Sequence, residues 1–221
     1  MNLNSKPNTS MKRLIIFILF FGCILQGRQA ASQSSAVDYM TMGMKLFEAQ
    51  DFMEAIISFN KAIEQDRSNF KAYYMRGNIK KLFEDHHGAM KDFNMAIELN
   101  PKDFEAYYER GNVKFALQDY YGAIADYTRT IELNENFVEA YYKRGQAKHQ
   151  LEAYGDAIND CSKIIEINPK NVDAYFLRGI LRLEHGQIEG GCLDLSKAGE
   201  LGDLKAYEVI KEKCNSKCFQ Y

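Results

Sequence analysis

A 34-residue period runs through most of the chain and constrains its fold more than any other feature. Glycine recurs at this spacing as Gly43, Gly77, Gly111, Gly145 and Gly179. Alanine keeps the same spacing as Ala55, Ala89, Ala123 and Ala157, and Gly191 takes the fifth place. Such self-similarity is typical of solenoids, in which each unit buries its apolar face against its neighbours. We therefore divide the chain into five repeats, with the first glycine at position 8: residues 36–69, 70–103, 104–137, 138–171 and 172–205.

The order of residues within each repeat predicts two antiparallel helices. Position 4 is always tyrosine, and position 24 is Phe59, Phe93, Tyr127, Cys161 or Leu195. Positions 8 and 20, like positions 4 and 24, are equidistant from a turn near position 14. We expect the glycine at position 8 to face the alanine at position 20 where the two helices approach most closely. Pro101 and Pro169 then end the second helix of two repeats, because proline cannot donate the next backbone hydrogen bond.

These features resemble the tetratricopeptide repeat (TPR) pattern over residues 36–205. The resemblance implies an all-α fold, an α-solenoid of stacked antiparallel helix pairs that forms a right-handed superhelix. The fifth repeat departs from the pattern, since Gly186, Gly190 and Gly199 weaken its second helix. Apolar residues at helical spacing follow from residue 204, and we expect residues 206–221 to form a C-terminal capping helix and tail.

Arginine at position 7 and aspartate at position 23 occur together in the last four repeats. We predict four structural ion pairs between the two helices of a repeat: Arg76–Asp92, Arg110–Asp126, Arg144–Asp160 and Arg178–Asp194. The alternative is an anion-binding site, which would need these arginines to be open to solvent.

The resemblance also implies a binding surface, because first helices line the concave face in this family. Positions 5 and 9 would place an aromatic stripe beside an amide stripe there. The candidate peptide-binding groove consists of Tyr74, Asn78, Tyr108, Asn112, Tyr142, Gln146 and Phe176. Aromatic rings offer contact area at low entropic cost, and carboxamides can pair with the backbone of an extended peptide. The alternative is that the tyrosines only pack between adjacent repeats.

Chaperone-binding members of the family use a carboxylate clamp with lysine at position 5. Tyr74 and Tyr108 stand there in this chain, so the resemblance does not imply binding to an acidic chaperone tail.

Charge and residue pattern argue against nucleic acid, metals and catalysis. The formal charge is -2, and removing residues 1–32 with their four basic residues leaves 24 basic against 30 acidic residues. Such a chain without a basic stripe repels phosphate backbones. The four histidines lack the i, i+4 spacing of a zinc helix, and we find no phosphate-binding loop or nucleophile elbow. We therefore expect no enzyme activity, no metal and no cofactor.

The first 32 residues have the pattern of a secretory signal peptide, with Met11 as an alternative start. Lys12 and Arg13 precede an apolar stretch at residues 14–25, which is too short to cross a bilayer unaided. Uncleaved anchoring and lipidation of Cys23 are the alternatives, and either would give the only membrane contact. We expect export to the periplasm, the cell surface or the extracellular space.

Four cysteines remain after the predicted signal: Cys161, Cys192, Cys214 and Cys218. An oxidising compartment would favour a disulfide between Cys214 and Cys218, which are close in sequence. A bridge between Cys161 and Cys192 is conceivable, but we expect two buried thiols.

The sequence thus predicts an exported scaffold that binds other proteins or extended peptides through its concave face. The alternative functions are a structural or assembly component of an envelope complex and, less favoured, an enzyme accessory subunit.

Overall fold

A computed structural model describes residues 38–214 of the chain. The predicted signal peptide and Cys218 lie outside these residues. The chain divides into two compact units, Met1–Ile79 and Lys80–Tyr221, and each is described by itself. From residue 38 to residue 214 all regular secondary structure is helical.

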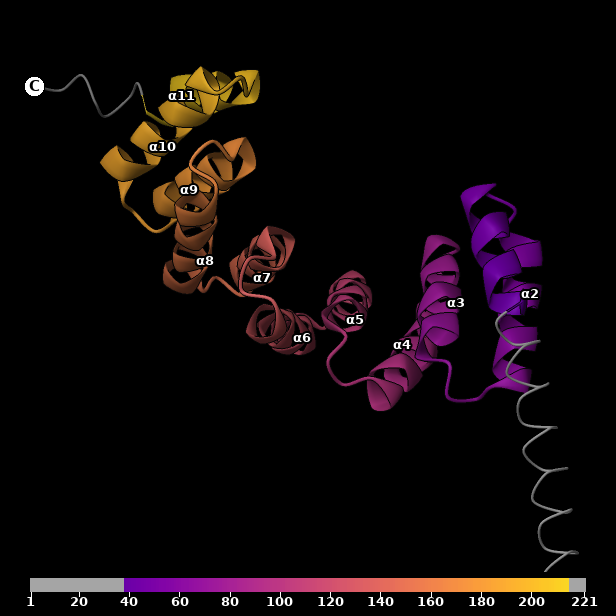
Figure 1. Cartoon of the computed structure of the whole chain (residues 1–221). Coiled ribbons are helices and arrows are strands. Elements are labelled where there is room, and N and C mark those ends of the chain that lie inside the picture. The colour runs from indigo at the N-terminus through magenta and orange to yellow at the C-terminus, as the bar shows by residue number, and fades with distance from the viewer. Residues whose placement is uncertain (1–37, 215–221) are drawn as a thin grey trace, which may run out of the picture. The chain divides into compact units, whose positions relative to one another are not determined.

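Ten helices with defined bounds follow a first helical segment at residues 38–48 (Figure 1). They are α2 (Phe52–Gln65), α3 (Phe70–Leu82), α4 (His86–Leu99), α5 (Phe104–Ala116), α6 (Tyr120–Leu133), α7 (Val138–Gln150), α8 (Tyr154–Ile167), α9 (Val172–Glu184), α10 (Ile188–Glu200) and α11 (Leu204–Lys213).

The first unit has its own core, built between residues 38–48, α2 and α3. Phe59 of α2 is fully buried there, together with Ala72 and Ile79 of α3. Tyr39 and Phe47 of the first helical segment pack against this cluster.

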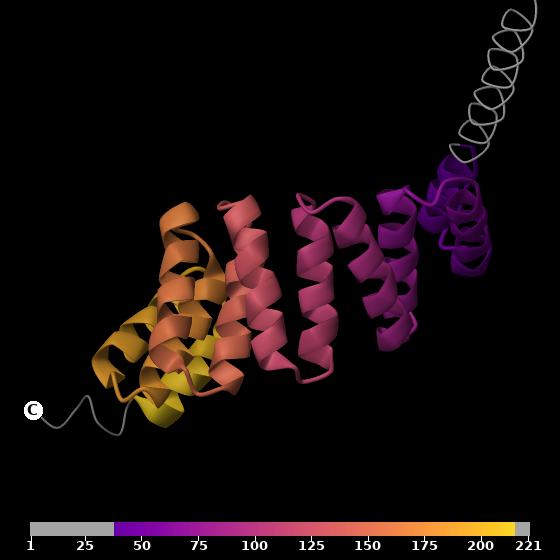
Figure 2. The ribbon, with the colours of Figure 1, turned by 90° about the horizontal axis from the view of Figure 1, so that it is seen from below.

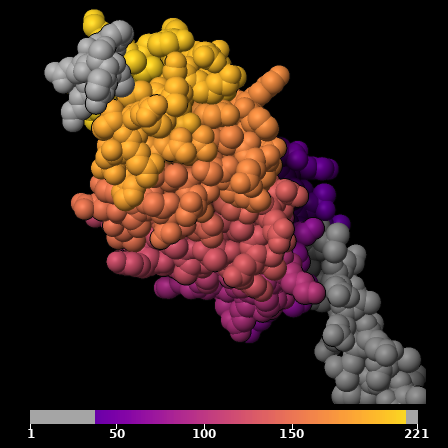
Figure 3. Space-filling view, turned by 90° about the vertical axis from the view of Figure 1, so that its left-hand side faces the viewer, coloured from indigo at the N-terminus to yellow at the C-terminus, as the bar shows by residue number. Residues whose placement is uncertain are grey.

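The second unit consists of helix pairs that stack in chain order. Within pairs, α5 packs against α6, α7 against α8, and α9 against α10, while α6 contacts α7 and α8 contacts α9 between pairs. Figure 2 shows these helices standing side by side. Helix α11 packs against α10, and Figure 3 views the second unit from this end. The all-α fold of stacked helix pairs with a final helix is confirmed.

The turn between the two helices of a pair carries a left-handed residue at position 15. Gln118 has a φ of 62° and Glu152 a φ of 57°, and the fifth repeat places Gly186 there with a φ of 82°. After this turn the second helix often begins with a capping aspartate, since Asp85 and Asp119 accept from the backbone N–H of Gly88 and Gly122. The sharp reversal of the chain therefore depends on the left-handed backbone at position 15 and, where aspartate is present, on the cap at the start of the second helix.

The prediction that glycine at position 8 faces alanine at position 20 is only partly right. A Cβ atom added to Gly111 would lie 2.7 Å from the Tyr127 ring, and one added to Gly43 would lie 2.6 Å from the Phe59 ring. These rings stand at position 24, so the glycine makes room for a large side chain. The backbones themselves approach closely in the fifth repeat, where a Cβ atom on Gly191 would lie 2.9 Å from the carbonyl oxygen of Gly179.

Three of the four predicted ion pairs are present. Arg110, Arg144 and Arg178 each donate from two nitrogens to both oxygens of the paired aspartate at 2.6–3.1 Å. Their side chains are only 14–19% exposed, which argues against the alternative of an open anion site. The pair between Arg76 and Asp92 would join the two units and stays a prediction.

Each of these arginines also donates a hydrogen bond to the preceding repeat. The remaining nitrogen of Arg144 donates to the Thr128 hydroxyl at 3.0 Å, and that of Arg178 to the Ser162 hydroxyl at 3.0 Å. In the first unit Arg76 likewise donates to Asn60. The acceptors all stand at position 25 of the earlier repeat, so each arginine links two neighbouring repeats.

A second cation pairs with each of these aspartates. Lys114 lies 2.8 Å from Asp126, and Lys148 lies 2.8 Å from Asp160. In the fifth repeat Arg182 takes the same place against Asp194. These cations stand at position 11, one helical turn after the arginine, so every buried aspartate here receives two charge-assisted contacts.

The expected disulfide between Cys214 and Cys218 is wrong, because Cys214 is bonded to Cys192. The Cα atoms of Cys192 and Cys214 are 6.0 Å apart. Cys192 lies on α10 and Cys214 caps α11, so the bond joins the fifth repeat to the final helix. Cys161 is a buried free thiol, as expected, whereas Cys192 is not. Sequence proximity was misleading, since packing of α11 on α10 brings Cys192 into bonding distance of Cys214.

Candidate functional site

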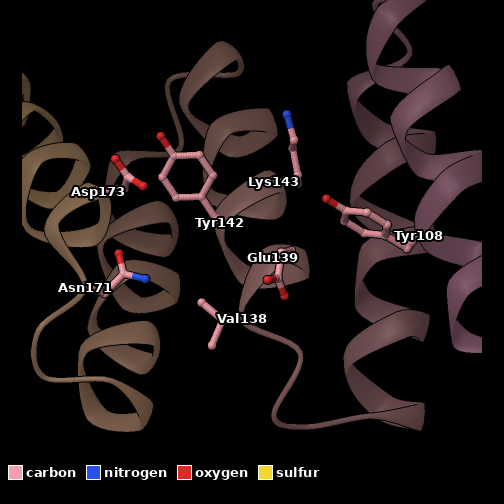
Figure 4. Close-up of a pocket in the computed structure, with 7 residues that line it drawn as sticks. All are labelled: Tyr108, Val138, Glu139, Tyr142, Lys143, Asn171 and Asp173. Carbon is pink, nitrogen blue, oxygen red and sulfur yellow. The ribbon is translucent and has the colours of Figure 1, made fainter. Parts of the chain in front are cut away.

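An open pocket of about 220 Å³ lies in the second unit, between the first helices of three successive repeats (Figure 4). Helix α5 contributes one side chain, α7 the middle wall, and the start of α9 the far side. The lining consists of Tyr108, Val138, Glu139, Tyr142, Lys143, Asn171 and Asp173. Two members of the predicted groove, Tyr108 and Tyr142, are thus brought to one hollow.

Tyr108 forms the α5 side of the pocket and is half-buried. Its ring packs edge-on against Phe137, with centroids 5.0 Å apart, and lies 5.9 Å from the Tyr127 ring. Burial raises the pKa of the Tyr108 hydroxyl, and the carboxylates of Glu109 and Glu139 raise it further. The hydroxyl is therefore a neutral donor at physiological pH, and one face of the residue stays open.

Tyr142 occupies the middle wall on α7. Part of its ring packs against the core cluster of Cys161, Leu177 and Leu181, which fixes its position. Burial raises the pKa of its hydroxyl, and the negative charge of Asp173 raises it further. Asp173 comes from the first turn of α9, so the two side chains join neighbouring repeats at the pocket.

The amides of the predicted groove are engaged within the protein. The hydroxyl of Tyr127 donates to the Asn112 carbonyl oxygen at 2.9 Å, and the Asn112 amide nitrogen donates to Glu109 at 3.1 Å. Gln146 forms a hydrogen bond with the hydroxyl of Tyr142. The Asn112 side chain also forms a hydrogen bond with the hydroxyl of Tyr108, so three neighbouring side chains hold it in place.

The remaining groove candidates are not among the residues that line this pocket. Tyr74 and Asn78 lie on α3 in the first unit and are half-buried. Phe176 is half-buried on α9 and packs against the terminal core cluster around Leu183 and Leu195. Tyr108 packs in the same way against the cluster of Ala123, Tyr127 and Ala147, but it also lines the pocket, which Phe176 does not.

Five lining residues are not members of the predicted groove: Val138, Glu139, Lys143, Asn171 and Asp173. Lys143 could have been found, because it follows Tyr142 directly and position 6 faces the preceding repeat. Val138 and Asn171 stand at the junction between repeats, where the loop geometry decides which side chain reaches the pocket.

Within residues 38–214, no three histidine, cysteine, aspartate or glutamate side chains are grouped so as to hold a metal ion. None of the helices in this range is long and apolar enough to span a bilayer.

Sequence profiles of one family match most of the repeats. A profile described as TPR repeat matches residues 111–152, and three described as tetratricopeptide repeat match residues 70–103, 138–171 and 161–192. No curated protein matches the chain.

Solved structures with similar folds cover most of the chain. A crystal structure of MamA is 25% identical with a TM-score of 0.71, and the match covers 80% of this chain and 94% of MamA. YrrB, described as a TPR protein with an unusual peptide-binding site, is 24% identical with a TM-score of 0.73, over 87% of this chain and 97% of YrrB.

A third similar structure contains a bound peptide. The first TPR of Spaghetti (RPAP3), bound to the HSP90 peptide SRMEEVD, is 29% identical with a TM-score of 0.53. That match covers 54% of this chain and 94% of the other. The repeat profiles and the stacked helix pairs agree, and this chain belongs to the tetratricopeptide-repeat family.

Proposed function

We propose that this protein is a scaffold, not an enzyme, and that it binds an extended segment of another protein along the first helices of its repeats. The observation that carries the proposal is the pocket shared by Tyr108 and Tyr142. These tyrosines stand at position 5 of two successive repeats, and both are half-buried. A rigid aromatic pair suits a peptide whose backbone runs across the helices.

The similarity to the peptide-bound TPR of Spaghetti supports a peptide ligand but not an acidic one. Tyr74 and Tyr108 stand where the carboxylate clamp of chaperone-binding members requires lysine. The ligand of this chain is therefore of a different chemical class from that of the similar structure.

We also propose that the protein is exported to the periplasm, the cell surface or the extracellular space. The signal-like segment at residues 1–32 supports this, and so does the disulfide between Cys192 and Cys214, because disulfides persist in oxidising compartments. Peptide mapping without reduction, on protein isolated from its native compartment, tests the proposal. A free Cys214 thiol in that material would contradict it.

Peptide selection tests the binding function. A random peptide library displayed on phage is selected against the repeat domain, and dissociation constants are then measured for the recovered peptides. We expect the double variant Tyr108→Ala/Tyr142→Ala to bind more than about tenfold more weakly, because buried aromatic anchors commonly contribute 2 kcal/mol or more.

The matched control is Tyr121→Ala, which removes a tyrosine from α6 that is 77% exposed and lies outside the pocket. Circular dichroism confirms that each variant retains its helices. Equal binding by the double variant and the wild type would move the binding site elsewhere, and failure to recover any peptide would favour a purely structural role.

A further inference from the structure

The charges of the pocket are unequal. Glu139 and Asp173 contribute two carboxylates, whereas Lys143 contributes one ammonium group. Both carboxylates are exposed, and neither has an ion-pair partner in the described part of the chain. The Lys143 side chain extends toward α5, where its ammonium group lies 5.9 Å from the centre of the Phe115 ring. The hollow is therefore net negative and offers open acceptors.

Helix position alone accounts for the presence of these acids but not for their surroundings. Glu139 and Asp173 stand in the first turns of α7 and α9, where the helix dipole favours negative charge. The dipole does not require a cavity at this place or tyrosine rings beside each carboxylate. Tyr142 lies next to Asp173, and Tyr108 faces the α7 wall that carries Glu139 (Figure 4).

Aromatic faces beside carboxylates form a favourable setting for a cation. A tyrosine ring attracts a positive charge within about 6 Å of its centre. The protein already uses this contact, since the guanidinium of Arg144 lies 5.5 Å from the centre of the Tyr141 ring. Burial is the main cause of the raised pKa of Tyr108 and Tyr142, and the negative charges of Glu139 and Asp173 add to it, in agreement with a negative potential at the hydroxyl groups.

We propose that this pocket receives a lysine or arginine side chain of the extended segment bound by the scaffold. Glu139 and Asp173 accept hydrogen bonds from the cationic group, and the rings of Tyr108 and Tyr142 contact its aliphatic stem. This inference rests on the proposed function and specifies the chemistry of its ligand. An acidic side chain at the same place would meet two carboxylates at close range and would be rejected.

Four fluorescein-labelled octapeptide libraries test the inference. Each library is random except for one central residue, fixed as arginine, lysine, glutamate or leucine, and binding to the full repeat domain is followed by fluorescence anisotropy. We expect the arginine and lysine libraries to bind at least about tenfold more tightly than the glutamate library. One charge-assisted hydrogen bond contributes enough binding free energy to change the dissociation constant by this factor.

Variants then assign the preference to this pocket. Glu139→Gln combined with Asp173→Asn should weaken binding of the arginine library by about tenfold and leave the leucine library unchanged. Lys143→Gln removes the opposing charge and should strengthen arginine binding. Glu189→Gln neutralises an exposed carboxylate on α10 and serves as the control that changes nothing.

The outcomes separate this inference from the proposed function. Equal binding of the arginine and glutamate libraries, or an unaltered preference in the Glu139/Asp173 variant, would overturn the inference that the pocket receives a basic side chain. The proposed peptide-binding function would still stand. If no library binds the wild-type domain, including the leucine library, the proposed function fails as well.

Discussion

The residue that faces each position-8 glycine decides whether that glycine is needed. A Cβ atom on Gly111 would lie 2.7 Å from the Tyr127 ring, which is also held by its hydrogen bond to Asn112. At Gly145 the facing residue is the smaller Cys161, and the nearest atom to an added Cβ would be 3.7 Å away. The same repeat position therefore has two different tolerances.

This difference predicts opposite effects of one substitution. Gly111→Ala should lower the free energy of unfolding by about 1–3 kcal/mol through overpacking. Gly145→Ala should raise it by about 0.5–1 kcal/mol, since alanine is the better helix former and meets only ordinary contacts. Urea denaturation of both variants provides the measurement, and each variant controls for the other. Equal changes of the same sign would show that the facing side chain is irrelevant.

The buried thiol of Cys161 makes stability depend on pH in the alkaline range. Burial raises its pKa from 9.0 to about 12 in the folded protein. Between these values the unfolded chain loses the proton and the folded protein keeps it. The stability contribution is thus fully present below pH 9 and is lost as pH rises, by up to about 1.4 kcal/mol per pH unit.

We therefore expect the melting temperature of Cys161→Ala to fall less steeply than that of the wild type between pH 9 and pH 11. Thermal melts at several pH values, read by circular dichroism, give the two slopes. Parallel slopes would contradict a buried, protonated thiol.

At the scale of elements, the final helix is held by packing and by one covalent bond. Tyr207 of α11 fills the space above Gly199, where an added Cβ atom would lie 2.5 Å from the ring. Ala206 and Cys214 join the core cluster of the fifth repeat. The disulfide to Cys192 closes a segment of 22 residues, which restricts the unfolded chain.

The double variant Cys192→Ser/Cys214→Ser should lose about 3 kcal/mol of stability, the entropic value for a loop of this size. Amide hydrogen exchange should show the loss first in α11, because a terminal helix contacts only one neighbour. Cys161→Ala is the control for removal of a cysteine outside the bond. Unchanged exchange in α11 would mean that packing alone holds the helix.

At the scale of the whole chain, periodicity predicts the architecture and the contacts between recurring residues, but not the contacts between residues that occur only once. The 34-residue spacing of glycine and alanine was sufficient to predict stacked helix pairs, since each repeat must bury its face on the next. The Arg144–Asp160 pair was also predictable because both residues recur together. The Lys148 contact recurs in the same way, since a cation stands at position 11 in every repeat that has aspartate at position 23. The Cys192 disulfide was not predictable, because these cysteines do not recur and their contact depends on how α11 packs on α10.

The candidate site was predicted in part for the same reason. Position 5 pointed to Tyr108 and Tyr142, which do share a pocket, but the register could not distinguish them from Phe176, which is also half-buried and does not line it. The repeat position determines on which face of the helix a side chain lies. The size of the neighbouring side chains determines how much of it is exposed to solvent.

The arginine hydrogen bonds between repeats all run from a later repeat to the one before it. Arg110, Arg144 and Arg178 each reach back to an acceptor in the preceding repeat, and none of them reaches forward for this bond. During synthesis from the N-terminus, each acceptor leaves the ribosome before the arginine that needs it. A newly made repeat can dock at once on a finished one, so the stack can grow in the order in which it is translated.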